Sequence, residues 1–197
     1  MHHPRLSFQC LPLVSLFAGI AIFVLLSAPS AAGQKTALRL DGTPADPFSL
    51  AAGKPVVLLF VRTDCPISNR YAPLIKRISS QYADKVGFWL VYPGKKTSAD
   101  QIRRNAREYA YELPAVRDPD QVLVAQAQAQ VTPEVAVFDG NHRLLYHGRI
   151  DDRYRGLGRA RSAATTHELE DAIRAAIYQK KPPVNMPAVG CYISDLE

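Results

Sequence analysis

A single thiol lies where one sequence pattern ends and another begins. The stretch LLFVRTDCPISNRYAPLI (58–75) closes an apolar run, places Cys65 after it, and continues with apolar residues at helical spacing. A cysteine at a helix N-terminus lies among unpaired backbone N–H groups and a partial positive charge, and both favour the reactive thiolate. The pattern therefore predicts a redox-active thiol at position 65, with an inert, partly buried cysteine as the alternative.

Charged and polar neighbours would act on this thiol in opposite directions. Arg62 would favour the thiolate, whereas the carboxylate of Asp64 would disfavour a second negative charge beside it. Three residues after Cys65 the chain has Ser68 and no second cysteine. A hydroxyl there can donate to a thiolate but cannot form a disulfide, so a sulfur partner must come from elsewhere in the chain.

The other two cysteines, Cys10 and Cys191, lie near the ends of the chain. Cys10 falls in a segment with a short positive start, the apolar stretch LPLVSLFAGIAIFVLL and the small residues SAPSAAG, which is typical of a secretory signal. We predict a signal peptide at 1–32 and export to the periplasm or another extracytoplasmic space, with an uncleaved membrane anchor as the alternative. In an oxidising space, Cys65 and Cys191 can pair.

The composition is ordinary for a globular protein with one domain of moderate size. The 197 residues are 47% hydrophobic and 21% charged, and the net charge of +6 is spread along the chain. Basic residues form no dense run interleaved with aromatic residues, so the sequence does not favour nucleic-acid binding. We expect one domain at 33–181 and a Pro-rich C-terminal tail at 182–197.

The elements that would hold Cys65 alternate between strands and helices. The continuous apolar run 56–61 predicts a buried strand, and Pro66 suits the first turn of a helix that runs to about Ala83. The first two strands should be parallel and the last two an antiparallel hairpin, in a mixed central sheet with helices on both faces. Before these elements we expect a leading loop at 34–54 with at most a short strand. The further expected strands are 86–93, 133–139 and 143–150, with a short strand within 115–121. The further expected helices are 98–112, capped by Ser98, then 122–129, and 166–180, which is capped by Thr165 or Thr166 and has lysines in its last turn.

This order resembles the thioredoxin fold over roughly residues 36–181. The resemblance rests on the strand–Cys–helix unit, on VTPEVAVF, and on the hairpin and closing helix. The motifs DCPISNRYAP, VTPEVAVFDG, GRIDDRY and GCYI resemble exported bacterial redoxins related to the alkyl hydroperoxide reductase and thiol-specific antioxidant group. The resemblance implies a catalytic Cys65 that faces a cis peptide between Thr132 and Pro133.

Departures from the relatives separate three functions. Ser68 stands where dithiol thioredoxins carry their second cysteine, and Arg62 stands where peroxiredoxins carry Thr or Ser, with Thr63 one place later. The cis-proline favours thiol–disulfide exchange, whereas peroxide reduction is the alternative. A non-enzymatic binding or copper-handling module, with His142 and His147 beside the cysteines, is the third possibility. We assign no residue to a cofactor or a metal.

The tail provides the expected partner for Cys65. In a thioredoxin-like sheet the last helix runs away from the active-site end, here by roughly 22 Å at 1.5 Å per residue. The Pro-rich tail, if extended, covers about 28 Å before Cys191, enough to return. We therefore predict that Cys191 is the resolving cysteine or a structural latch, with a frayed tail as the alternative.

The expected activity is that of a thiol-dependent oxidoreductase with Cys65, Cys191, Thr132 and Pro133 in catalytic roles. Arg62, Thr63, Asp64 and Ser68 support them. The expected partners are a disulfide-bearing protein, or a small thiol or peroxide substrate, and a reductant that the sequence does not identify. Contact with a membrane is expected only through the N-terminal segment if it is not cleaved.

Overall fold

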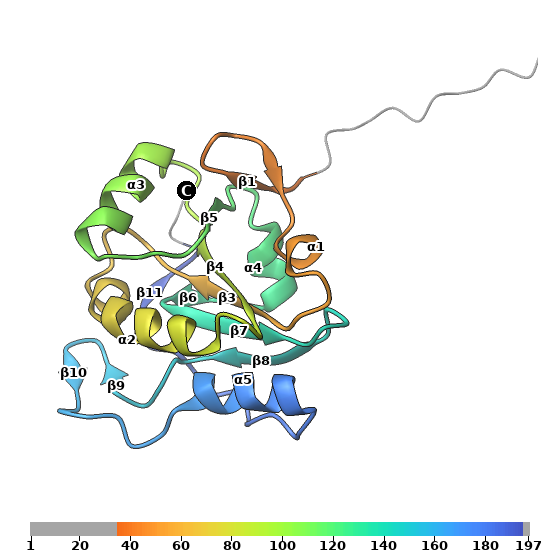
Figure 1. Ribbon diagram of the computed structural model, residues 1–197. Coiled ribbons are helices and arrows are strands. Elements are labelled where there is room, and N and C mark those ends of the chain that lie inside the picture. Colours follow the sequence, from red (N-terminus) through yellow and green to blue (C-terminus); the bar gives the residue numbers. More distant parts are fainter. Residues whose placement is uncertain (1–34, 195–197) are drawn as a thin grey trace, which may run out of the picture. The chain divides into compact units, whose positions relative to one another are not determined.

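A seven-stranded mixed sheet, in the order β2-β1-β5-β4-β3-β7-β8, forms the centre of the protein (Figure 1). The computed structural model describes residues 35–194, so the predicted signal peptide lies outside the described residues. Three strands run parallel, and the hairpin of β7 and β8 adds to β3 antiparallel, as predicted. The strands are β3 (Val56–Phe60), β4 (Gly87–Tyr92), β5 (Ala115–Arg117), β7 (Glu134–Phe138) and β8 (Leu144–Gly148).

Helices cover both faces of the sheet, because alternate residues of the central strands point to opposite sides. Val57 and Leu59 of β3 belong to one buried cluster, whereas Val56, Leu58 and Phe60 belong to the other. The first cluster lies under α2 (Pro66–Tyr82), α3 (Ala99–Glu108) and α5 (Glu168–Tyr178), and the second under α1 (Pro47–Ala51) and α4 (Val122–Ala127).

The leading segment is more regular than a loop, so this expectation from the sequence was wrong. β1 (Ala37–Arg39) and β2 (Pro44–Ala45) form an antiparallel pair, and β1 extends the sheet by pairing with β5. The side chain of Asp46 then caps α1 by accepting from the backbone N–H of Phe48 at 3.0 Å. The strands are too short to show an alternating pattern, which is why the sequence did not indicate them.

Helix α3 begins where the sequence predicted but ends four residues earlier. Ser98 caps α3 with a complete capping box, as predicted. The helix ends at Glu108 and not at 112, because Ala110 adopts a left-handed φ of 53° and the chain turns there. This turn directs the hydroxyl of Tyr111 to the carbonyl of Ser68, 3.1 Å away.

The predicted caps of the last helix were also wrong. His167 stands at the N-cap of α5 and makes no side-chain cap. The hydroxyl of Thr165 donates to Asp152 at 2.6 Å, and that of Thr166 donates to Glu168 at 2.7 Å, so neither caps the helix. Acidic residues occupy the first turn, but α5 ends at Tyr178, before the lysines that we expected in its last turn.

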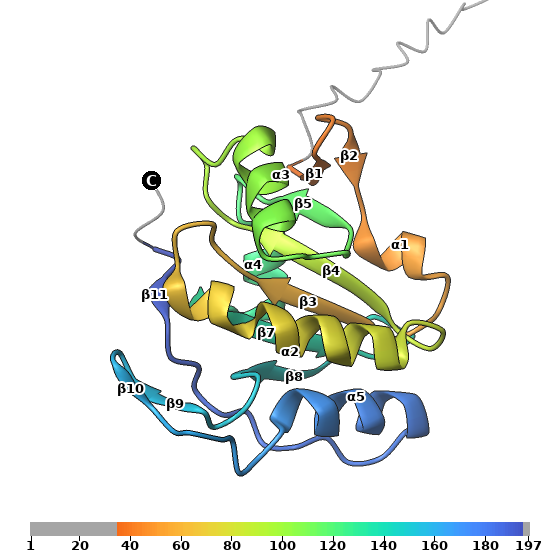
Figure 2. The same cartoon turned by 60° about the vertical axis from the view of Figure 1, so that its left-hand side comes forward.

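Two small sheets complete the fold at one end of the molecule. β9 (Tyr154–Gly156) and β10 (Arg159–Ala160) form an antiparallel hairpin. The tail leaves α5, passes β8 and this hairpin, and ends as β11 (Cys191–Tyr192) paired with β6 (Val131–Thr132) (Figure 2). The C-terminal segment therefore lies beside the start of α2.

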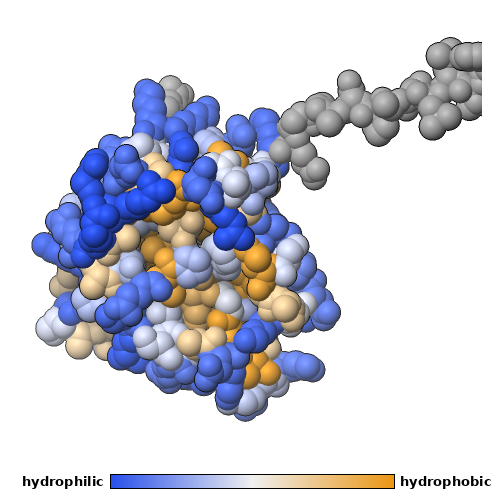
Figure 3. Space-filling view, turned by 45° about the horizontal axis from the view of Figure 1, so that its top comes forward, coloured by the Kyte–Doolittle hydropathy of each residue, from blue (hydrophilic) through white to orange (hydrophobic). Residues whose placement is uncertain are grey.

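The face of the protein shown in Figure 3 is mostly polar. Figure 3 shows hydrophilic side chains gathered over α3 and apolar side chains nearer the centre of this face. None of the helices between residues 35 and 194 has the length and apolar character needed to span a bilayer. Among residues 35–194, the large apolar side chains with high exposure are Leu50, Leu157, Tyr178, Val184 and Tyr192. Tyr192 is next to Cys191 in the sequence.

Candidate active site

Cys65 lies at the N-cap of α2, directly beyond the C-terminal end of β3, as the sequence predicted. Pro66 occupies the first helical position, where the backbone N–H that proline lacks would have no acceptor within the helix. The side chain of Cys65 is fully buried, and its Sγ donates to the carbonyl oxygen of Thr132 at 3.2 Å. The thiol is therefore held between the helix start and the β6 segment.

The peptide between Thr132 and Pro133 is cis, and Thr132 faces Cys65, as predicted. A residue that the sequence analysis missed fixes this segment. Glu134 is buried, and its Oε2 accepts from the backbone N–H groups of Gln130 and Val131 at 2.8 and 3.1 Å. A carboxylate inside the apolar stretch VTPEVAVF was the available signal, because a buried charge requires partners.

The tail brings Cys191 to Cys65. In β11 Cys191 lies opposite Thr132 in an antiparallel register, and Tyr192 lies opposite Val131. The Sγ atoms of Cys191 and Cys65 are 3.5 Å apart, and both residues are free thiols. The predicted return of the tail is confirmed, and the alternative of a frayed tail was wrong for residues up to 194.

Backbone contacts hold the tail along its length. The backbone N–H of Arg149 donates to the carbonyl of Met186 at 2.9 Å, and that of Ile193 donates to Gln130 at 2.9 Å. Gly190 lies so close to the Thr132 carbonyl that a Cβ at this position would be 2.0 Å from the oxygen. Ile193 is 2% exposed and anchors the end of the tail in the second buried cluster.

Comparison with known proteins agrees with this geometry. Residues 53–144 match the profile of a family described as thioredoxin-like. The protein has a thioredoxin-like fold. The resemblance to thioredoxin-like redoxins is confirmed, and the match is consistent with the alkyl hydroperoxide reductase and thiol-specific antioxidant group. No curated protein matches the sequence significantly.

Solved structures support the same fold at low sequence identity. A hypothetical protein from Sinorhizobium meliloti 1021 superposes with a TM-score of 0.68 at 20% identity, covering 80% of this chain and 88% of its own. An uncharacterized conserved protein from Geobacillus kaustophilus gives 0.68 at 20% identity, covering 81% and 89%. An uncharacterized thioredoxin-like protein from Porphyromonas gingivalis gives 0.55 at 19% identity, covering 74% and 92%.

The two sulfurs of this thioredoxin-like site have different acidities. Burial disfavours the charged form of Cys65, but the Ser68 hydroxyl, the Cys191 thiol and the N-terminal N–H groups of α2 favour it. Together they hold the pKa of Cys65 below its usual value. Burial and the adjacent Cys65 raise the pKa of Cys191. Cys65 is therefore the more acidic thiol of the pair and Cys191 the less acidic one.

Ser68 is the neighbour best placed to act on this thiolate. Its hydroxyl is fully buried and has no hydrogen-bond partner among the described residues. An unpaired buried hydroxyl costs free energy unless a partner appears. A Cys65 thiolate supplies that partner, because the hydroxyl can donate to the charged sulfur.

The charged residues that precede Cys65 bind each other. The guanidinium of Arg62 donates to both carboxylate oxygens of Asp64, at 3.0 and 2.8 Å. Their charges largely cancel, so neither acts on Cys65 as an isolated charge. The carbonyl of Thr63 accepts from Asn69 at 3.1 Å, which fixes the loop before the helix.

The histidines expected near the cysteines have other partners. The His142 ring packs on Phe48 with its centroid 5.0 Å away, and His147 Nδ1 lies 3.3 Å from Glu134 Oε1. Over the described part of the chain, no three His, Cys, Asp or Glu side chains gather closely enough to hold a metal ion. These contacts give the copper-handling alternative no support.

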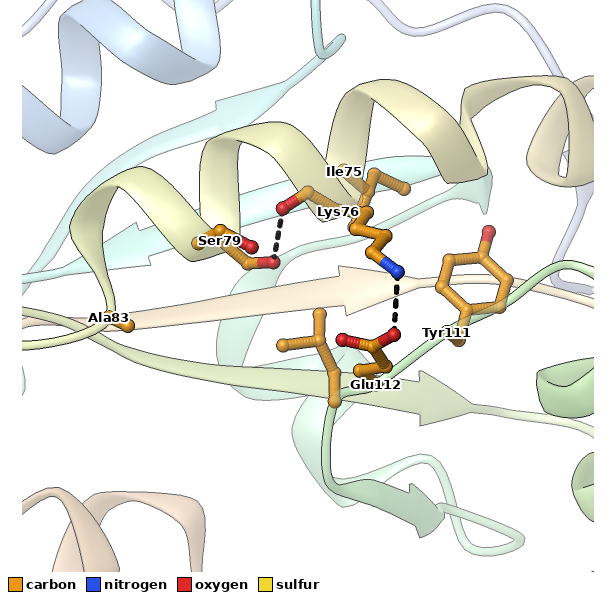
Figure 4. A pocket seen from close by; sticks show the side chains of 8 residues that line it. Ile75, Lys76, Ser79, Ala83, Tyr111 and Glu112 are labelled. Carbon is orange, nitrogen blue, oxygen red and sulfur yellow. Dashed lines mark hydrogen bonds and ion pairs between the residues drawn. The ribbon is translucent and has the colours of Figure 1, made fainter.

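A shallow pocket of about 150 Å³ between α2 and residues 111–113 lies apart from the thiols (Figure 4). The ammonium of Lys76 and the carboxylate of Glu112 form an exposed ion pair across it, 2.5 Å apart. Ser79 donates its hydroxyl to the Lys76 carbonyl at 3.1 Å. The Lys76, Glu112 and Ser79 side chains that line the pocket are therefore bound within it.

Proposed function

We propose that this protein is a thiol–disulfide oxidoreductase that acts outside the cytoplasm and cycles between a Cys65/Cys191 dithiol and the corresponding disulfide. The observation that carries the proposal is the 3.5 Å separation of the two Sγ atoms. A small movement of either side chain brings them to bonding distance, about 2.05 Å. The thioredoxin-like family match supports a thiol oxidoreductase at a general level.

The chemistry needs a thiolate and a second sulfur within reach, and the site offers both. Cys65 has the lowered pKa, with Ser68 and the helix N-terminus favouring its charge. The thiolate attacks an oxidised sulfur, and disulfide exchange conserves the total number of sulfur–sulfur bonds. Peroxide reduction has less support, because the Arg62 guanidinium is bound by Asp64 and is not free to orient a peroxide.

The test compares the two reactions in the full chain with Cys10→Ser. Intact mass with thiol capping measures whether a Cys65–Cys191 disulfide forms under oxidising conditions. Turnover is then measured with a model disulfide and with hydrogen peroxide, for this protein and for its Cys65→Ser variant. We expect disulfide turnover that is lost with Cys65→Ser. Two thiols that never pair, or turnover that survives the substitution, would contradict the proposal.

A further inference from the structure

The two sulfurs of the pair differ in their access to solvent. Cys65 has no exposed surface, because α2, the Thr132 segment and the tail enclose it. Cys191 is half-buried, and the neighbouring Tyr192 is 62% exposed. A molecule that approaches the folded protein therefore meets the sulfur of Cys191 first.

The strand edge beside Cys65 is already occupied. An incoming disulfide-bearing peptide would need the backbone of Thr132 to add as an extra strand. Cys191 of β11 pairs with this residue, and Ile193 donates to Gln130 beyond it. The tail thus fills the position that an extended substrate would take, and a peptide cannot reach Cys65 while the tail is docked.

Removing the tail to expose Cys65 would break several contacts together. The backbone bonds of Met186 and Ile193 would open, and the buried Ile193 side chain would enter water. Gly190 would lose its close approach to the Thr132 carbonyl. The docked tail therefore favours reaction at Cys191, whose sulfur can be reached without undocking the tail.

We propose that exchange partners bond to Cys191 and that Cys65 acts only on Cys191 from inside the protein. This inference rests on the proposed function. It makes the tail the arm that contacts the partner, in place of the thiol at the helix start. The partner is a small thiol or disulfide, or a protein whose sulfur projects far enough to reach a half-buried surface cysteine.

Each half of the cycle balances in bonds, electrons and protons. An external thiolate attacks Cys191 Sγ of the disulfide, which forms a mixed disulfide at Cys191 and releases Cys65 as a thiolate. A second external thiolate attacks the partner's sulfur in the mixed disulfide, so an external disulfide leaves and Cys191 becomes a thiol. Two external thiols are oxidised, the protein gains two electrons, and the two protons pass to its cysteines.

The lowered pKa of Cys65 suits its role as the inner sulfur. A sulfur with a lowered pKa leaves readily as a thiolate, and Cys65 has that property. In the reverse direction Cys191, once deprotonated, attacks an external disulfide and expels one external thiolate. The Cys65 thiolate then attacks Cys191 Sγ of the mixed disulfide and expels the second external thiolate. Attack by a buried thiolate on a sulfur 3.5 Å away needs no solvent access to Cys65.

The first test uses single-cysteine variants of the full chain with Cys10→Ser. Cys65→Ser leaves Cys191, and Cys191→Ser leaves Cys65 behind a docked tail. Both variants react with dithiodipyridine, an uncharged disulfide that releases a coloured thiol. We expect the protein that keeps Cys191 to react at least about tenfold faster at a pH where Cys191 is ionised, and both to react equally when denatured. Equal rates in the folded state, or a faster reaction of Cys65, would overturn the inference.

The second test maps the mixed disulfide in the protein with both thiols. The oxidised protein is mixed with glutathione, quenched with acid and digested, and the glutathionylated peptide is identified by mass. We expect the adduct on the peptide that contains Cys191, and an adduct on Cys65 would overturn the inference. If no adduct accumulates, the single-cysteine rates decide. Failure of the dithiol to close at all would instead refute the proposed function.

Discussion

At the scale of single residues, the site depends on a sulfur whose charge is stabilised by few groups. The N-terminal N–H groups of α2 and the Ser68 hydroxyl favour the Cys65 thiolate against the cost of burial. The Arg62 and Asp64 side chains bind each other, so the nearest full charges contribute little. Ser68 is therefore the side chain whose removal should change the acidity of Cys65 most.

We expect Ser68→Ala to raise the pKa of Cys65 by about 1–2 units, because a hydrogen bond to a charged group contributes about 1.5–3 kcal/mol. Absorbance of the thiolate at different pH values measures this in the Cys10→Ser, Cys191→Ser protein. Ser79→Ala is the matched control, since Ser79 is also buried on α2 but donates to Lys76. An unchanged pKa would show that Ser68 does not bind the thiolate.

The lowered pKa also sets how the exchange rate depends on pH. The reactive form of Cys65 is lost as pH falls through its pKa, which lies below that of an ordinary thiol. We therefore expect closure of a mixed disulfide at Cys191 to slow as the pH falls, with a midpoint below that of an ordinary thiol. Stopped-flow release of the external thiol measures this. In Ser68→Ala the pH profile of the closure rate should move to higher pH. An unchanged profile would contradict the role of Ser68 as a hydrogen-bond donor to the Cys65 thiolate.

At the scale of elements, the tail positions the second sulfur by backbone contacts more than by side chains. Gly190 lies against the Thr132 carbonyl, and Gly148 lies against that of Met186, where an added Cβ would be 2.2 Å from the oxygen. Only glycine permits such approaches of one backbone to another. These two glycines therefore determine whether β11 can dock.

We expect Gly190→Ala to slow formation of the Cys65–Cys191 disulfide by about tenfold, because the added Cβ displaces the tail and the two Sγ atoms are no longer held close together. The same substitution should increase labelling of Cys65 by a bulky maleimide. Quenched intact-mass measurements follow both reactions. Gly156→Ala is the control, since a Cβ there meets only Arg159 at 3.9 Å. Equal rates in the two variants would mean that the docked tail is not what brings the thiols together.

The capping box of α3 allows a test that separates stability from chemistry. Ser98 accepts from the Gln101 N–H, and the Gln101 side chain accepts from the Ser98 N–H. We expect Ser98→Ala to lower the free energy of unfolding by about 1 kcal/mol and to leave the exchange rate unchanged. Denaturant titration and the dithiodipyridine assay measure the two quantities. A changed exchange rate would show that α3 influences the thiols.

The sequence predicted the elements with strong local signals and missed those that depend on distant contacts. The apolar run before Cys65, Pro66 and Ser98 each act within a few residues, so α2 and α3 began where expected. The caps of α5 could not be predicted, because Thr165 donates to Asp152, thirteen residues away. Glu134 was missed for a similar reason, since its role appears only when residues 130 and 131 fold against it.

At the scale of the whole molecule, the pair joins the N-terminus of α2 to the C-terminal strand β11. Cys65 and Cys191 are 126 positions apart, so their disulfide would close most of the described chain into one loop. In the chain-entropy model, closing a loop of this length stabilises the folded state by about 4–5 kcal/mol. The redox state should therefore change the stability of the protein as well as its chemistry.

We expect the oxidised protein to unfold about 10 °C or more above the reduced protein, from the loop-closure term and the usual entropy of unfolding per residue. Thermal unfolding of the Cys10→Ser chain, with and without reductant, measures the difference. A Cys65→Ser, Cys191→Ser variant is the control and should show no effect of reductant. We attribute this stabilisation to closure of the loop and not to the pairing of β11 with β6, because that pairing is already present when both cysteines are free thiols. Equal melting temperatures in the two redox states, with the disulfide verified by mass, would mean that the unfolded chain is already restricted or that the bond strains the docked tail.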